Sequence, residues 1–320
     1  DRCSGASIRN GDIDTMHDAA HRQLPPAGKI CLDHVAHFVP HIDAASAALA
    51  AMGFTLTPFS PQSHRLEPGG PVVPAGTGNR CVMLNEGYLE ILTPTADTPI
   101  ANQLRSAIKR YVGVHLIAFG TSTPVLDHER LFEAGFAPLS PVALQREIET
   151  PDARDMARFT VVRVPPGAMA EGRIQYCQHH TPHLLWQPRW LEHANGAQAL
   201  TGVLICVEDP QQAAQRYARF TGLLPHFSGG LWRLDTTRGC LAFMDPGNCR
   251  RNFALEPPVL PWLAGYSLSC ENLAATRAYL TTNGITQRKL GEDRCFVELP
   301  SSVGGLLVLE AARAAPLAFV

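Results

Sequence analysis

Two histidines and one glutamate have the types and positions that suggest chemistry in this sequence. His34 and His115 each lie in a short apolar segment, and we interpret the two segments as equivalent strands of a repeated unit. Glu90 lies between apolar neighbours, where an unpaired charge would be costly. A single histidine in an apolar strand is usually a hydrogen-bonded core residue, so it is the repetition that favours a site. Two imidazoles and a carboxylate suit a divalent ion such as Fe, Mn, Ni or Zn.

Such an ion would take two neighbouring oxygens of a substrate at its open coordination positions. It would then stabilise an enolate, or hold a catecholate beside O₂. The elements that must position these ligands follow from an internal repeat. Four segments share a plan of apolar strand, helix start signal, amphipathic helix and closing glycine; their strands span 30–38, 112–119, 202–207 and 264–269, and their glycines are Gly53, Gly135, Gly222 and Gly284. The expected helix caps are Asp43, Thr123, Asp209 and Asn272.

After each helix the chain returns as strands, so the unit is β-α-β-β-β. We therefore predict an α+β fold of four βαβββ modules, paired 1 with 2 and 3 with 4, because one module cannot bury its sheet alone. The predicted organisation is an arm over residues 1–28, a first domain over 29–185, a linker over 186–199 and a second domain over 200–320. In the second domain Leu204 and Tyr266 occupy the histidine positions, which predicts a copy without metal ligands.

This arrangement resembles the vicinal oxygen chelate superfamily, which includes glyoxalase I, extradiol dioxygenases, methylmalonyl-CoA epimerase and the bleomycin-resistance proteins. The phrases that carry the resemblance are Leu32-Asp33-His34-Val35, Tyr88-Leu89-Glu90-Ile91, Gly113-Val114-His115-Leu116 and Tyr176-Cys177-Gln178-His179-His180-Thr181-Pro182. It is closest to the glyoxalase-like proteins of bacteria. The repeated plan covers about residues 30–311.

The resemblance implies metal ligands on the first and last strands of each module. It assigns His34, Glu90 and His115 as ligands, and the shared Thr-Pro ending selects Gln178 as the fourth. Counting from the preceding glycines selects Gln175 instead. His180 shares a strand face with Gln178, and it is the third candidate for this position.

The implied function is that of a metal-dependent glyoxalase-like enzyme acting on a small oxygen-chelating substrate. An isomerase, epimerase or lyase would abstract a proton next to a carbonyl, with Glu90 or His180 as the base. One alternative is an extradiol ring-cleaving dioxygenase that uses Fe(II). A second alternative, from another class, is a non-catalytic protein that sequesters a small molecule such as an antibiotic.

Composition limits the partners. The formal net charge of −2 leaves no electrostatic footprint for nucleic acid or an anionic membrane. Nine widely spaced cysteines without a CxxC pair predict reduced thiols and a cytoplasmic protein. The sequence has no apolar run long enough for a membrane span. We expect a small-molecule substrate, with a homodimer contact as one role open to the second pair of modules.

Overall fold

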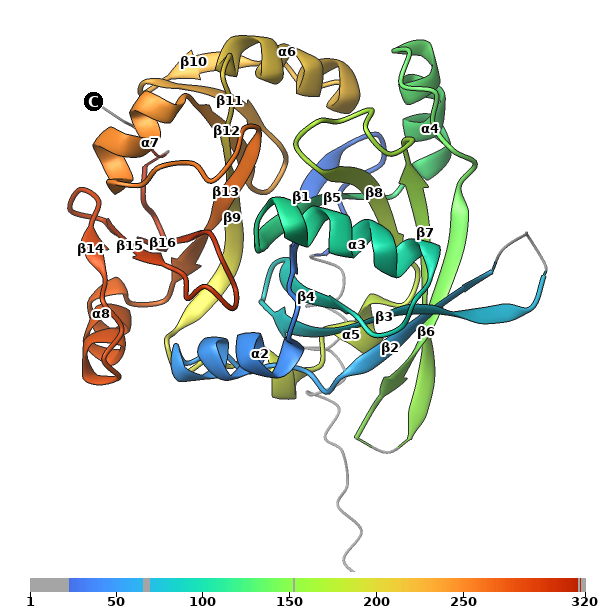
Figure 1. The fold of residues 1–320 in the computed structure, drawn as a ribbon, viewed down its shortest axis with the longest axis horizontal. Coiled ribbons are helices and arrows are strands. Elements are labelled where there is room, and N and C mark those ends of the chain that lie inside the picture. Colours follow the sequence, from blue (N-terminus) through green and yellow to red (C-terminus); the bar gives the residue numbers. More distant parts are fainter. Residues whose placement is uncertain (1–22, 66–69, 152, 316, 318–320) are drawn as a thin grey trace, which may run out of the picture.

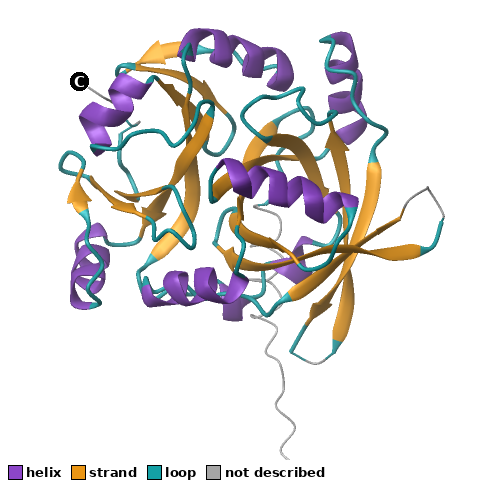
Figure 2. Ribbon diagram, in the orientation of Figure 1, coloured by secondary structure: helices purple, strands orange, loops and turns teal. Residues whose placement is uncertain are grey.

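The computed structural model describes residues 23–65, 70–151, 153–315 and 317, and it builds two curved eight-stranded sheets (Figures 1 and 2). The expected α+β fold with two paired sets of modules is confirmed. The first sheet has the order β2-β3-β4-β1-β5-β8-β7-β6, and the second has the order β10-β11-β12-β9-β13-β16-β15-β14. Each sheet thus joins two modules through an antiparallel pair at its centre, β1 with β5 and β9 with β13.

The first sheet comes from the N-terminal part of the chain. Its strands are β1 (Ile30–Phe38), β2 (Ser60–Arg65), β3 (Val72–Met83), β4 (Tyr88–Pro94), β5 (Gly113–Thr121), β6 (Val142–Glu149), β7 (Arg154–Arg163) and β8 (Arg173–His179). The helices between and after them are α2 (Ile42–Ala51), α3 (Pro99–Arg110), α4 (Pro124–Glu133) and the short α5 (Pro182–Leu185), followed by the 3₁₀ turn Pro188–Trp190. The expected arm over residues 1–28 lies largely outside the described residues.

The second sheet begins at Ala197, inside the expected linker. Its strands are β9 (Ala197–Cys206), β10 (His226–Ser228), β11 (Leu231–Asp235), β12 (Cys240–Met244), β13 (Trp262–Cys270), β14 (Arg288–Lys289), β15 (Arg294–Glu298) and β16 (Leu306–Ala311). Its helices are α6 (Pro210–Thr221), α7 (Pro246–Phe253) and α8 (Leu273–Thr282). In the described part of the chain, no helix combines the length and the apolar character that crossing a membrane requires.

Local signals explain most helix ends. The side chains of Asp209 and Asn272 accept hydrogen bonds from first-turn amides of α6 and α8, as expected. Thr123 precedes α4 but makes no capping bond, and α2 begins after His41 rather than at Asp43. All four closing glycines have positive φ, the conformation that glycine adopts without steric cost. Helices α3 and α7, which connect the paired modules, were not predicted.

The apolar residues form three clusters. The largest is shared by both sheets and includes Val35 and Ile117 of the first sheet with Ile205 and Leu309 of the second. The other two clusters lie on the inner, concave face of each sheet. In the second sheet that face is filled by apolar side chains such as Leu204, Ala242 and Val308. The concave face of the first sheet instead carries most of the buried polar groups discussed below.

Candidate functional site

Two bulges on the central strands of the first sheet decide which side chains face the concave side. On β1, Leu32 pairs with Phe119 and His34 with Ala118, which leaves Asp33 without a partner between them. On β5, His115 is left unpaired in the same way between Val114 and Leu116. A bulge places an additional residue against the partner strand, so Asp33 and His34 can both point into the concave face.

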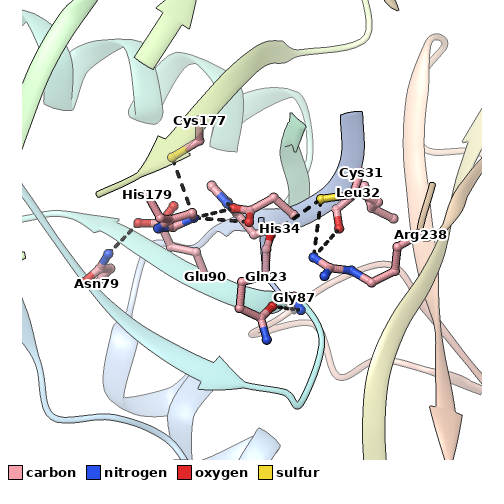
Figure 3. A network of polar contacts seen from close by, with 11 residues as sticks. Gln23, Cys31, Leu32, His34, Asn79, Gly87, Glu90, Cys177, His179 and Arg238 are labelled. Atoms are coloured by element: carbon pink, nitrogen blue, oxygen red, sulfur yellow. Dashed lines mark hydrogen bonds and ion pairs between the residues drawn. The ribbon is translucent and has the colours of Figure 1, made fainter. Parts of the chain in front are cut away.

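Asp33 is the centre of a buried hydrogen-bond network. Figure 3 shows His34, Cys177 and His179 of this network. His34 donates from Nδ1 to Oδ2 of Asp33 at 2.6 Å, and Nε2 of His179 lies 2.9 Å from the same oxygen and 3.1 Å from Oδ1. The Sγ atom of Cys177 lies 3.8 Å from Nε2 of His179. Asp33, His34, Cys177 and His179 are all buried. The aromatic rings of Tyr88, Phe159 and Trp186 pack edge-on against His179.

The network keeps its charges in spite of burial. Burial alone would raise the pKa of Asp33, but the charge of His179 and the hydrogen bonds from both histidines hold it well below its usual range. Burial alone would lower the pKa of His179, but the charge of Asp33 raises it to about 10. Asp33 and His179 therefore form a buried ion pair at neutral pH.

The same residues are the candidate metal group. Within the described ranges, the His, Cys, Asp and Glu donor atoms that converge to within 4.8 Å belong to Asp33, Cys177 and His179. Carboxylate, thiolate and imidazole together suit Zn(II). However, the His179 nitrogen that faces Cys177 is the one hydrogen-bonded to Asp33, so an ion would have to displace that proton.

Glu90 on β4 anchors a second polar network on the concave face. Its Oε1 atom accepts hydrogen bonds from Nδ2 of Asn79 at 2.5 Å and from Nε2 of Gln62 at 3.1 Å. Gln62 is fixed in turn by Thr77, whose hydroxyl donates to it at 2.7 Å. Arg146 on β6 donates to Oδ1 of Asn79 at 3.1 Å. Glu90 is thus 8% exposed and oriented by amide donors.

A groove of about 250 Å³ lies beside this second network. Arg146 and Met83 line it, together with Leu184, Leu185 and Trp190 from the segment after β8. Met83, Leu184 and Leu185 also belong to the apolar cluster of the concave face. Arg146 therefore connects an accessible groove to the hydrogen bonds that hold Glu90.

The structure does not bring the expected metal ligands together. Counted from the two bulges, Asp33 corresponds to His115, and His34 corresponds to Leu116, so the two histidines are not equivalent. The ring of His115 stacks on Tyr111 at 3.9 Å and donates from Nε2 to the Tyr111 carbonyl at 2.8 Å. Burial lowers the pKa of His115 to about 4, which favours this neutral, hydrogen-bonded form.

The fourth position also follows from the register. Glu90 pairs with Ala36 on β1, and the equivalent Ala118 on β5 pairs with Gln175, so the alternative Gln175 is the counterpart of Glu90. Gln178 lies on the opposite face of β8, where its amide donates to the Ser122 carbonyl. His180 is exposed and hydrogen-bonds to Thr160. Alternation along the strand thus directs both Gln178 and His180 away from Glu90.

A family-type centre of four ligands therefore does not fit these residues, because an apolar Leu116 stands where the second histidine would be needed. The sequence reasoning also missed Asp33 and His179. Both lie within the quoted phrases, next to His34 and His180, but their pairing across 146 positions has no local signal.

Comparisons with known proteins agree with this architecture. The model of a family described as a glyoxalase-like domain matches residues 32–221. No curated protein matches the sequence. Among solved structures, a hypothetical protein from Staphylococcus aureus is 10% identical with a TM-score of 0.61, covering 88% of this chain and 99% of that one.

Two further solved structures share the fold. A mutant of 4-hydroxymandelate synthase from Streptomyces coelicolor is 14% identical with a TM-score of 0.55, covering 90% of this chain and 94% of that one. A xylose isomerase-like TIM barrel/4-hydroxyphenylpyruvate dioxygenase fusion protein is 10% identical with a TM-score of 0.53, covering 92% of this chain and 51% of that one. The expected resemblance to the vicinal oxygen chelate superfamily is confirmed. With the family model matching more than half of its length, the chain belongs to the glyoxalase-like domain family.

Proposed function

We propose that this protein is an enzyme that binds a small molecule on the concave face of the first sheet. In this proposal Glu90 acts as the general base and removes a proton next to a carbonyl group. The observation that carries the proposal is the arrangement of Glu90, whose Oε1 atom is held by Asn79 and Gln62. Among the described residues, Oε2 has no hydrogen-bond partner and Glu90 has no ion-pair partner.

The surroundings of Glu90 suit proton transfer. Two amide donors orient the carboxylate without neutralising it, so it remains able to accept a proton. Its cross-strand neighbour on β1 is the small residue Ala36. The cation Arg146 lies one hydrogen bond away, on Asn79, and would stabilise negative charge that develops on the substrate oxygen.

In this proposal no metal ion takes part in the proton transfer, because an apolar Leu116 stands in place of the second histidine of the expected ligand set. We propose that Asp33 and His179 work as a buried ion pair that positions His34 beside the stacked ring of Tyr88, 4.3 Å away. Metal analysis of the purified protein tests this part. A stoichiometric ion that is lost on Cys177→Ser substitution would show that the group binds metal instead.

The test of the reaction is solvent exchange. The protein is incubated in D₂O with a panel of 2-oxo carboxylates, such as pyruvate and 2-oxobutyrate, and loss of the C3 proton signal is followed by ¹H NMR. We expect exchange above the uncatalysed rate for at least one compound, and a decrease of roughly 10²–10⁴-fold in Glu90→Gln. The matched control is Glu298→Gln, an exposed strand residue of the second sheet.

Two results would contradict the proposal: exchange in Glu90→Gln at the wild-type rate, or no exchange with any member of the panel. Oxygen uptake with catechols, measured on the same preparation, would instead support the ring-cleaving alternative. Tight binding of a panel compound without exchange or oxygen uptake would support a non-catalytic binding protein.

A further inference from the structure

We propose that Arg163, Arg173 and Gln175 form an oxyanion subsite on the concave face of the first sheet, and that it binds the carboxylate group of the substrate. As a statement about substrate class this rests on the proposed function; as a statement about anion binding it stands on the arginines alone.

The sheet register places the three side chains together. Gln175 on β8 pairs directly with Arg163 on β7, and Arg173 precedes Gln175 by two residues on the same strand. Residues two apart on a strand share a face. This is the face of Cys177, which contacts His179, and Arg173 itself lies over the ring of Phe38 in the concave cluster. The three side chains therefore face the same interior as Glu90.

In the described part of the chain, the guanidinium groups of Arg163 and Arg173 make no ion pair. Among the described residues, no ion pair and no hydrogen bond is made by the Arg163 side chain, and its Nε atom is buried without a partner. The hydrogen bond of Arg173 reaches a neutral amide, Oε1 of Gln103, at 3.4 Å. Two other arginines with little exposure are instead paired with acids: Arg216 with Glu171 and Arg294 with Glu310.

The charges of Arg163 and Arg173 favour an anionic ligand. Burial lowers the pKa of Arg163, and burial together with the charge of Arg163 lowers the pKa of Arg173 to about 10. Both groups stay charged at neutral pH, so two like charges lie close together and partly out of water. Such an arrangement is unfavourable until an anion joins it, and the planar guanidinium fork matches a carboxylate with two parallel hydrogen bonds.

Glu90 and Arg173 belong to one row of paired residues across the concave face. Glu90 is close enough that its negative charge acts on Arg173. The row of paired residues that carries Glu90 continues through Ala36 on β1 and Leu116 on β5 to Arg173 on β8. A substrate with its carboxylate on the arginines would thus extend along the concave face toward Glu90.

The experiment measures anion binding by isothermal titration and by thermal shift. The probes are pyruvate, inorganic phosphate and the neutral analogue acetamide, with wild type, Arg163→Gln, Arg173→Gln and the exposed helix control Arg219→Gln. We expect wild type and Arg219→Gln to bind pyruvate and to ignore acetamide. Each of the two site variants should bind pyruvate at least about tenfold more weakly, because a charge-assisted hydrogen bond is lost. Stronger binding of phosphate than pyruvate would overturn the assignment to a carboxylate.

The melting temperatures separate loss of the subsite from a loss of affinity that is caused by misfolding of the variant. Since Arg163→Gln removes one of two unpaired like charges, its melting temperature without anion should equal or exceed that of wild type, while the stabilisation by pyruvate disappears. A large decrease without anion, or unchanged pyruvate binding in both site variants, would overturn the subsite. Failure of the proposed function alone would give a different result. Wild type and Glu90→Gln would both bind pyruvate, and neither would catalyse exchange.

Discussion

His37 gives the sharpest test of how the two halves of the molecule are joined. It lies on β1, is fully buried, and points away from the concave face toward the second half. Its Nδ1 atom donates to the carbonyl of Val303 at 3.0 Å, and its Nε2 atom lies 3.2 Å from the hydroxyl of Tyr266. A neutral imidazole satisfies both contacts, with Nε2 accepting from the tyrosine.

Acid should therefore weaken the protein through this residue. Burial lowers the pKa of His37 from 6.5 to about 4. Between these two values the unfolded chain binds the proton and the folded chain does not, so the free energy of unfolding falls as the pH falls. The full difference corresponds to about 3 kcal/mol, of which about 2 kcal/mol is lost between pH 7 and pH 5.

The measurement is urea unfolding at several pH values between 5 and 8, followed by tryptophan fluorescence. His37→Gln should be less stable than wild type at pH 7 by about 1–3 kcal/mol, because a buried hydrogen bond is lost. Its stability should fall by about 2 kcal/mol less than that of wild type between pH 7 and pH 5. The exposed His183→Gln variant is the control. Parallel pH profiles for wild type and His37→Gln would refute the reasoning.

Three further results are expected. Gly304→Ala should destabilise the protein by more than about 2 kcal/mol beyond Gly284→Ala in thermal unfolding. The two glycines have nearly equal positive φ, but of the two only Gly304 would place a Cβ against a carbonyl, that of Val112. Equal effects would contradict this close approach. Asp33→Asn should cost about 3–5 kcal/mol in urea unfolding, against less than about 1 kcal/mol for the more exposed Asp293→Asn, because it leaves a buried charge unpaired; a mild effect would argue against the ion pair. His115→Gln should leave the metal content, measured by mass spectrometry, equal to that of wild type; a decrease would restore His115 as a ligand.

The repeat and its helices could be predicted because their signals are local. Closing glycines such as Gly222 and capping residues such as Asp209 act within one turn of the chain. The same locality explains what was missed. The residue bounds of β2 and β6 were not predicted, since edge strands gain their order from pairing with β3 and β7 rather than from their own pattern.

The arrangement of the site residues could not be predicted from local signals alone. The sequence by itself determined the α+β modules and the candidates His34 and Glu90, and it showed that the second half lacks equivalent polar residues. It also favoured Gln178 as the fourth ligand through the shared Thr-Pro ending, with Gln175 as the alternative. Choosing required the strand register, because a shift of one residue moves every side chain of a strand to the other face.

Only the tertiary structure decided the rest. The bulges at Asp33 and His115 offset the two histidines by one position. The fold also brought Asp33 of β1 to His179 of β8, which lies two strands away in the sheet. It also left Arg163 without a carboxylate partner among the described residues. Whether a buried charge has a partner depends on side chains from other strands, so no pattern along one strand can encode it.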